Sequence, residues 1–212
     1  MKQRKADHAL LVETVQDLKQ LHEKHEKAGY DVSGLVEDSR MLIFENKELS
    51  FLMVKPTDVP VYVEHGVADF GICGKDTLLE SGAHIYEMMD LGYGKCKLSL
   101  AGKPGTDTRQ SGLKVATKYT HFAKEFFRKR GQAVEIIPLY GSVELGPITG
   151  LSDIILDIVE SGKTLKENGL VVLEDIVPIS ARLVVNRVSL KLNAPFMQQF
   201  IKNVQAALEE EA

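Results

Sequence analysis

The chain has 212 residues, of which 44% are hydrophobic and 26% charged, and its formal net charge is −4. This length and composition predict one large or two small globular domains with a substantial core. The acidic balance argues against a nucleic-acid-binding protein, which usually carries a basic surplus. We find neither a signal peptide nor a run of 18 apolar residues, so we expect a cytoplasmic protein that binds neither membrane nor nucleic acid.

The sequence contains no recognisable set of metal ligands. Cys73 and Cys96 are too few and too far apart for a zinc site, and we expect them to be free thiols in a reducing compartment. His22 and His25 lie three residues apart, but no cysteine or carboxylate pattern supports a metal role for them. We therefore predict no metal held mainly by protein side chains.

The first half of the chain is predicted to begin with a helix. Leu11, Val15 and Leu18 recur at helical spacing, so residues 8–28 predict an amphipathic helix that stops at Gly29. From residue 41 the pattern changes to apolar runs separated by short helical stretches. The expected strands are 41–46, 49–54, 67–74, 84–90 and 96–102, and the expected helices are 58–65 and 75–82.

The second half continues the alternation. The expected strands are 113–117, 134–139, 153–159, 170–176 and 181–186, and the expected helices are 119–131, 163–169 and 194–209. Strands that alternate with helices predict an α/β fold with one or two mostly parallel sheets. The segment 103–112 reads as an ordinary surface loop or as a piece near a domain crossover.

The turn after the strand 153–159 has the composition of a phosphate site. Ser161, Gly162, Lys163 and Thr164 offer backbone N–H groups, two hydroxyls and an ammonium group at the start of a helix. Such a combination suits an anion. The turn is not a Walker A sequence. A plain capped helix start explains these residues equally well.

Three acidic residues lie near predicted strand ends. Asp153 and Asp157 would share one face if the strand runs through them, or would converge around a turn, and could hold ribose hydroxyls or serve only as caps. Glu144, in "YGSVELGP", would emerge at the carboxyl end of strand 134–139. Ligands bind at that edge in open α/β sheets, although a simple strand-to-helix connection also fits.

Two cations are weaker candidates. Lys75, in "GKD", follows a predicted strand and would bring a positive charge to the same kind of sheet edge. The alternative there is a glycine turn with Asp76 as a helix cap. Arg40 precedes a predicted strand and could reach an anion, but an isolated arginine is most often a surface residue.

Several segments together resemble the short-form catalytic subunit of ATP phosphoribosyltransferase. The segments are "DSRMLIFEN", "VKPTDVPVYVEHGVADFGICGKDTLLE", "DLGYGKCKLSLAG", "VATKY", "LYGSVELGPITGLSDIILDIVESGKTLKENGL" and "ISARLVVN". They cover about residues 28–193. Long motifs in the same order are far more specific than a single glycine pattern.

The resemblance implies a fold of two α/β domains of periplasmic-binding-protein type (type II-like) around a cleft. Domain I would comprise residues 1–94 with 180–212, and domain II would comprise residues 95–179 and carry the phosphate loop. Because the printed sequence ends soon after "VNRVSLK", we expect the short form, which lacks the regulatory domain of the long form.

The implied reaction joins ATP to phosphoribosyl pyrophosphate (PRPP), giving N1-(5-phosphoribosyl)-ATP and pyrophosphate. It is the first step of histidine biosynthesis and requires Mg²⁺. The resemblance also implies a regulatory subunit similar to histidyl-tRNA synthetase, and a homodimer of the catalytic chain within a hetero-oligomer.

The resemblance assigns roles to the candidate residues. Asp157 would meet the ribose hydroxyls of PRPP, with Asp153 nearby, and the turn would hold the 5′-phosphate through Ser161, Gly162, Lys163, Thr164 and Leu165. Arg40, in "DSR", and Lys75 would be the catalytic cations, and Glu144 would line the cleft.

One departure from the family pattern concerns the N-terminus. Members of the family begin with a strand and a "KGR" segment, and here we expect neither, because the chain starts "MKQRKADHALLVETVQDLKQLHEK". The alternative function is therefore a catalytically impaired homologue, or a non-catalytic one that only binds a ligand or assembles with a partner.

Overall fold

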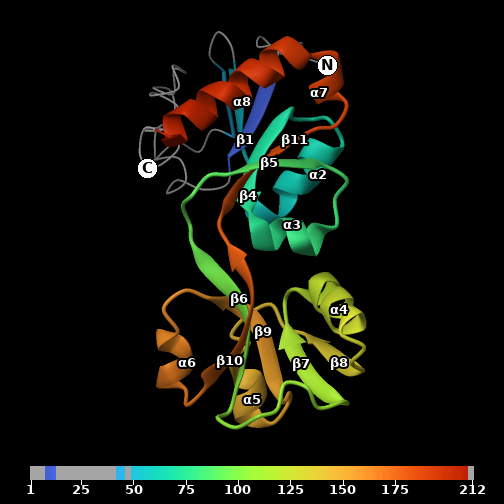
Figure 1. Cartoon of the computed structure of the whole chain (residues 1–212), viewed down its shortest axis with the longest axis vertical. Helices are drawn as coiled ribbons and strands as arrows, with labels where there is room; N and C mark the ends of the chain where they lie inside the picture. The colour runs from blue at the N-terminus through green and yellow to red at the C-terminus, as the bar shows by residue number, and fades with distance from the viewer. Residues whose placement is uncertain (1–7, 13–41, 46–48, 210–212) are drawn as a thin grey trace. The chain divides into compact units, whose positions relative to one another are not determined.

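The computed structural model describes residues 8–12, 42–45 and 49–209. The chain divides into two compact units, Met1–Tyr93 with Ala181–Ala212, and Gly94–Ser180 (Figure 1). The two points where the chain passes between the units lie beside the domain boundaries expected from the sequence. Each unit has its own β-sheet with helices, so the predicted α/β class is confirmed.

The described part of the first unit contains a six-stranded sheet in the order β2-β3-β1-β4-β11-β5. Strands β3, β1 and β4 run parallel, whereas β2, β11 and β5 are antiparallel to their neighbours. The strands are β1 (His8–Val12), β2 (Ile43–Glu45), β3 (Leu49–Met53), β4 (Phe70–Gly74), β5 (Tyr86–Asp90) and β11 (Ala181–Val185).

The prediction of a helix over residues 8–28 is wrong at its start, because His8–Val12 form strand β1. The strand lies between β3 and β4, with His8 paired to Leu49 and Leu10 paired to Phe70. A short, largely apolar run such as "HALLV" suits a central parallel strand, which needs no alternation of polar residues. The expectation that the N-terminal stretch supplies no central strand is therefore also wrong. Residues 13–28, with His22 and His25, lie outside the described residues.

Helices pack on both faces of this sheet. On β4, Phe70 and Ile72 belong to the core cluster that includes Phe200 of α8 (Ala194–Glu209), and the Phe70 and Phe200 ring centroids are 4.1 Å apart. The intervening Gly71 and Cys73 face α2 (Val59–Glu64) on the opposite side. The period of two along β4 therefore buries both faces. The remaining elements of this unit are η1 (Pro56–Asp58), α3 (Lys75–Ser81) and α7 (Ser189–Leu192).

The second unit contains a five-stranded sheet in the order β10-β6-β9-β7-β8. Strand β9 is antiparallel to β6 and parallel to β7, and it therefore lies at the change of direction within the sheet. The strands are β6 (Cys96–Gly102), β7 (Leu113–Thr117), β8 (Val134–Pro138), β9 (Ile154–Val159) and β10 (Val171–Ile179).

Three helices complete the second unit: α4 (Thr120–Lys129), α5 (Leu145–Thr149) and α6 (Lys163–Glu167). One buried cluster joins Ala101, Ala116 and Ile155 of three adjacent strands to Val143 before α5 and Leu165 of α6. This cluster fixes α5 and α6 on the same face of the sheet, beside the end of β9.

The expectation of mostly parallel sheets is wrong. Among the described strands, four pairings are parallel and five are antiparallel. The two strands next to the unit boundaries explain much of the difference. Strand β6 enters the second unit and β10 leaves it, and these two pair with each other in opposite directions.

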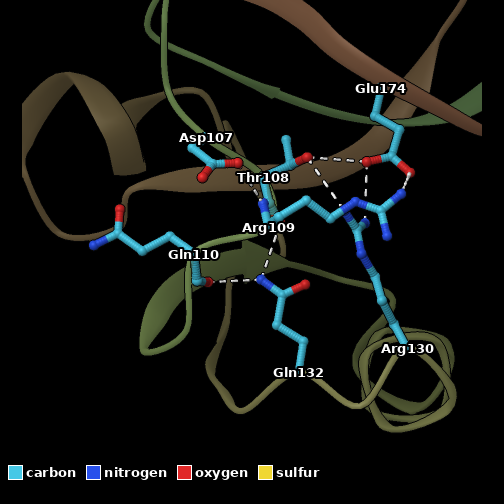
Figure 2. Close-up of polar contacts among 7 residues, drawn as sticks. All are labelled: Asp107, Thr108, Arg109, Gln110, Arg130, Gln132 and Glu174. Atoms are coloured by element: carbon cyan, nitrogen blue, oxygen red, sulfur yellow. Dashed lines mark hydrogen bonds and ion pairs between the residues drawn. The ribbon is translucent and has the colours of Figure 1, made fainter.

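The segment 103–112 is a surface loop that belongs to the second unit. Side-chain hydrogen bonds and ion pairs attach it to the rest of that unit (Figure 2). The Thr108 hydroxyl donates to Glu174 at 3.0 Å, and the Arg130 guanidinium reaches the same carboxylate at 3.0 Å. The side-chain amide of Gln132 donates to the Thr108 carbonyl at 2.9 Å. The loop is thus fastened to β10 and to the end of α4, away from both crossings between the units.

Three further features bear on function. Cys73 is buried, Cys96 is half-buried, and neither is in a disulfide bond. Within the described ranges, no three His, Cys, Asp or Glu side chains converge as a metal site. No helix in those ranges is both long and apolar enough to span a bilayer.

Candidate functional site

A cavity of about 280 Å³ lies at the carboxyl end of β9 in the second unit. Its lining includes Glu144, at the start of α5, and Asp157, on β9. The turn into α6 supplies most of the remaining lining. The structure thus brings together Glu144 and all but one of the residues predicted to bind PRPP, namely Asp157, Ser161, Gly162, Lys163, Thr164 and Leu165.

The turn is fixed at both ends by buried residues. Ile154 to Leu156 hold β9 in the core, and Leu165, which is 5% exposed, anchors α6 in the cluster beside the sheet. Between them Gly162 has φ +69°, a left-handed conformation that glycine adopts without steric cost. The backbone of the turn is therefore held in one shape before any ligand arrives.

The turn presents hydrogen-bond donors to the cavity. The N–H groups of Thr164 and Leu165 have no acceptor among the described residues, as is usual in the first turn of a helix. The side chain of Thr164 is exposed, and the Ser161 hydroxyl only weakly engages the Lys163 N–H, at 3.4 Å. Because α6 has five residues, individual amides rather than a long helix dipole would meet an anion.

The charges that line the cavity are mainly negative. Glu144, Asp157 and Glu160 are carboxylates, whereas Lys163 is the one lysine or arginine in the lining. The Lys163 ammonium group lies 3.8 Å from the carboxylate of Glu167 and is largely exposed. A polyanionic ligand therefore needs positive charge from outside this lining.

Asp153 lies apart from the cavity. It precedes β9, and its carboxylate accepts a hydrogen bond from the Lys114 backbone N–H at 2.8 Å. The strand runs straight from Asp153 to Asp157, so the two side chains do not converge and are separated by roughly 13 Å along the strand. This contact matches the alternative role of Asp153 as a cap at the strand end. The cavity gives no support to the assignment of Asp153 to PRPP, because Asp153 does not line it.

The two predicted catalytic cations belong to the first unit. Lys75 begins α3 and forms an ion pair with Glu87 of β5. Glu87 also meets Arg182 of β11, at 3.2 Å, and Arg182 in turn meets Asp90, at 3.0 Å. Lys75 is therefore held in a charge network at a sheet edge. Arg40 lies outside the described residues.

The sequence did not indicate that β7 contributes to this site. Thr117, the last residue of β7, is fully buried, and its hydroxyl donates to the Leu156 carbonyl at 2.6 Å. The same hydroxyl accepts the Tyr119 N–H at 2.9 Å. This side chain fastens the end of β7 to β9, next to Asp157. The segment "VATKY" was the available indication of a role for this strand end. The sequence alone does not show that β7 lies next to β9.

A second cavity, of about 400 Å³, shares the stretch 159–162 with the first. Lys97 and Asp175 line it and form an ion pair at 2.5 Å. The Ser99 hydroxyl donates to the same carboxylate at 2.8 Å. Hydrogen bonds from Lys97 and then Ser99 lower the pKa of Asp175 below its usual range.

Comparison with known proteins identifies the family. Residues 55–209 match the family model described as ATP phosphoribosyltransferase. The chain belongs to the ATP phosphoribosyltransferase family. An ATP phosphoribosyltransferase of Clostridium kluyveri is 52% identical over 189 residues, which cover 87% of this chain and 86% of that protein. One from Caldanaerobacter subterraneus subsp. tengcongensis is 49% identical over 185 residues, covering 86% and 88%.

Solved structures agree with this assignment. A chain of the ATP phosphoribosyltransferase HisG:HisZ complex from Thermotoga maritima has a TM-score of 0.83 and 34% identity, covering 96% of this chain and 99% of that one. The VFT2 domain of Bordetella pertussis BvgS has a TM-score of 0.57 at 12% identity, covering 96% and 86%. At that identity the likeness concerns the fold alone, and it confirms the periplasmic-binding-protein type. As an ATP phosphoribosyltransferase, the chain is a glycosyltransferase.

Proposed function

We propose that this chain condenses ATP with PRPP to give N1-(5-phosphoribosyl)-ATP and pyrophosphate, the first step of histidine biosynthesis, in the cytoplasm. One observation carries the proposal. In a chain of the ATP phosphoribosyltransferase family, all the residues that the resemblance assigns to PRPP except Asp153 line one cavity at the carboxyl end of β9. That position is where open α/β sheets bind ligands.

The cavity suggests how PRPP is held. The free amides of Thr164 and Leu165 and the hydroxyls of Ser161 and Thr164 bind the 5′-phosphate, because several N–H and O–H donors then surround one anion. The Asp157 carboxylate accepts hydrogen bonds from the ribose hydroxyls. These contacts fix the sugar with its anomeric carbon free for attack.

The chemistry requires orientation more than acid or base groups. Adenine N1 donates its electron pair to the anomeric carbon, the bond from that carbon to the diphosphate oxygen breaks, and its electrons leave with pyrophosphate. Displacement at an anomeric carbon passes through an oxocarbenium-like state. The residues that hold both reactants contribute by alignment and by stabilising the charges that develop. Asp157 would place a negative charge near the sugar in that state.

The donor set fits a Mg²⁺ ion carried by the substrates. The cavity offers the carboxylates Glu144 and Asp157 but no converging group of three ligands among the described residues. Mg²⁺ commonly takes one or two carboxylates and completes its shell with phosphate oxygens and water. When bound, the ion would neutralise charge on the leaving pyrophosphate.

The first unit and a partner complete the proposal. We assign Arg40 to the leaving pyrophosphate and Lys75 to a second catalytic cation, as the resemblance implies, with Glu87 holding Lys75 in place. The Thermotoga maritima relative was solved as a complex of HisG with HisZ. We therefore propose a similar regulatory subunit, related to histidyl-tRNA synthetase, bound to a homodimer of this chain.

The test measures PRPP binding and turnover in the same variants. Thr164→Val keeps the shape of the side chain but removes a hydroxyl from the phosphate turn. We expect PRPP affinity to fall by about 10-fold, as for a hydrogen bond to a charged group. Calorimetry with Mg²⁺ measures binding, and pyrophosphate release with ATP, with the partner added, measures turnover.

Thr149→Val is a suitable control, because within the described part of the chain the Thr149 hydroxyl bonds only to carbonyls of α5. Absence of PRPP binding by the unaltered chain would refute the proposal. Normal binding without turnover, with the partner present, would instead support the non-catalytic alternative.

A further inference from the structure

We propose that Lys118 is a substrate-binding residue that contacts the diphosphate group of PRPP. This inference rests on the proposed function, since it adds a cation to the same site. Lys118 directly follows β7, on the strand that neighbours β9 within the sheet. Lys118 does not line the cavity around the phosphate turn, residues 161–165. With Lys118 included, the proposed site reaches from that cavity along the edge of the sheet to the end of β7.

The strand register places Lys118 beside Asp157. Strands β7 and β9 are parallel, with Val115 paired to Ile154 and Ala116 paired to Ile155. Two residues beyond that last pair, the strands reach Lys118 and Asp157. The contact of Thr117 with the Leu156 carbonyl, at 2.6 Å, shows that the strands are still adjacent at this level. Lys118 is therefore the first side chain past the end of β7, next to the carboxylate assigned to ribose.

The charge of the cavity calls for such a cation. Three carboxylates and one lysine line it, and that lysine lies near Glu167. PRPP brings a 5′-phosphate and a diphosphate, so the lining alone would repel it. Backbone amides can satisfy the 5′-phosphate, but none of the lining residues compensates the diphosphate. Lys97, on the other side of β9, is already paired with Asp175.

The surroundings of Lys118 leave its charge available. The side chain is exposed and forms no ion pair with a carboxylate of the described residues. Its ammonium group lies 4.9 Å from the centroid of the Tyr119 ring, and Tyr119 is buried, at 4% exposed. This cation–π contact restricts the long side chain without neutralising it. The ammonium group of Lys118 is therefore restricted in position but still able to form an ion pair with an anionic ligand.

The position also indicates which part of PRPP it meets. The phosphate turn lies beyond the carboxyl end of β9, whereas the register of β7 and β9 brings Lys118 to the level of Asp157, before that turn. If Asp157 holds the ribose hydroxyls, the 5′-phosphate occupies one end of the sugar and the diphosphate the other. Lys118 is then on the diphosphate end, where negative charge increases as the bond breaks.

The experiment compares Lys118→Met with Lys114→Met in the full chain with Mg²⁺. Lys114 is an exposed lysine near the opposite end of the same strand, so it controls for loss of one charge from β7. Calorimetry with PRPP, pyrophosphate and ribose 5-phosphate separates the two ends of the substrate. For Lys118→Met we expect PRPP and pyrophosphate affinity to fall about 10- to 100-fold, with ribose 5-phosphate affinity unchanged. Lys118→Arg should recover most of the loss.

Two results would overturn the inference. One is unchanged PRPP affinity in Lys118→Met while Thr164→Val still weakens PRPP, which leaves the proposed function intact. The other is an equal loss for ribose 5-phosphate and pyrophosphate, which indicates a general disturbance of the site. If the unaltered chain binds no PRPP, the proposed function itself fails, and this inference fails with it.

Discussion

At the scale of single residues, Asp175 is a carboxylate that lines the second cavity and whose ionisation is shifted by its hydrogen bonds. Its hydrogen bonds from Lys97 and Ser99 stabilise the ionised form, so the pKa of Asp175 lies below its usual range in the folded protein. A carboxyl group whose pKa is lowered by folding stabilises the native state only while it is ionised. Its contribution is therefore present above its unfolded pKa and is lost as the pH falls through the folded pKa.

This predicts the pH dependence of an Asp175→Asn variant. At pH 7 we expect its free energy of unfolding to be lower than that of the unaltered chain by at most about 1 kcal/mol, because both partners of the ion pair are largely exposed. The difference should shrink as the pH falls below about 4, the ordinary pKa of an aspartate carboxyl group. Urea denaturation at several pH values measures it. A difference that stays constant across this range would show that the ion pair is not its cause.

The candidate site was partly readable from single residues. The Ser-Gly-Lys-Thr composition of the turn predicted donors, and they do line a cavity. The spacing of Asp153 and Asp157 allowed either a shared strand or a turn, and local sequence cannot decide which side chain reaches a ligand. Lys118 was not singled out, because its value depends on β9 lying next to β7, about 40 residues away along the chain.

At the scale of elements, β4 is confined between two helices. An added Cβ at Gly71 would lie 2.7 Å from Val59 Cγ1 and 2.8 Å from Val63 Cγ2, both on α2. β-Branched side chains on a helix have little rotamer freedom with which to move aside. The absence of a side chain at Gly71 therefore sets how closely α2 approaches the sheet.

We predict that Gly71→Ala destabilises the first unit by about 1–3 kcal/mol through overpacking. Hydrogen exchange of the β4 and β11 amides should accelerate accordingly, since these strands pair directly. Gly141→Ala is a matched control, because an added Cβ there meets nothing within 4 Å. Unchanged exchange in Gly71→Ala would mean that α2 can shift at no measurable cost.

Most elements were predictable because their apolar runs are bounded by clear stops. Gly66, for instance, follows α2 with φ +68°, as expected for the glycine that ends a helix. Strand β1 was not predictable in this way. Its five residues begin a sequence with helical spacing, and only pairing with β3 and β4 selects the strand. The parallel or antiparallel direction of neighbouring strands was also not predictable, because it depends on which strands lead from one unit to the other.

At the scale of the whole molecule, the chain's two compact units make the consequences of a mutation separable. Each unit has its own sheet and its own buried clusters. A change confined to the backbone of one sheet should therefore weaken that unit more than the other. Strand β1 is the informative place for such a change, because it is the central strand that the N-terminal sequence was not expected to supply.

We predict that Leu11→Pro selectively destabilises the first unit. Leu11 pairs with Leu52 of β3 and with Gly71 of β4, so the strand has a neighbour on each side. Proline removes an amide N–H from a central strand and should cost about 1–3 kcal/mol for the hydrogen bond left unmade. Amides of β4 and β11 should lose protection from hydrogen exchange, whereas amides of β7 and β9 should keep it. Leu11→Val, which retains the N–H, is the control and should leave both patterns unchanged. Equal loss in the two units would show that they unfold together, and no loss in either would show that β1 does not pair in this register.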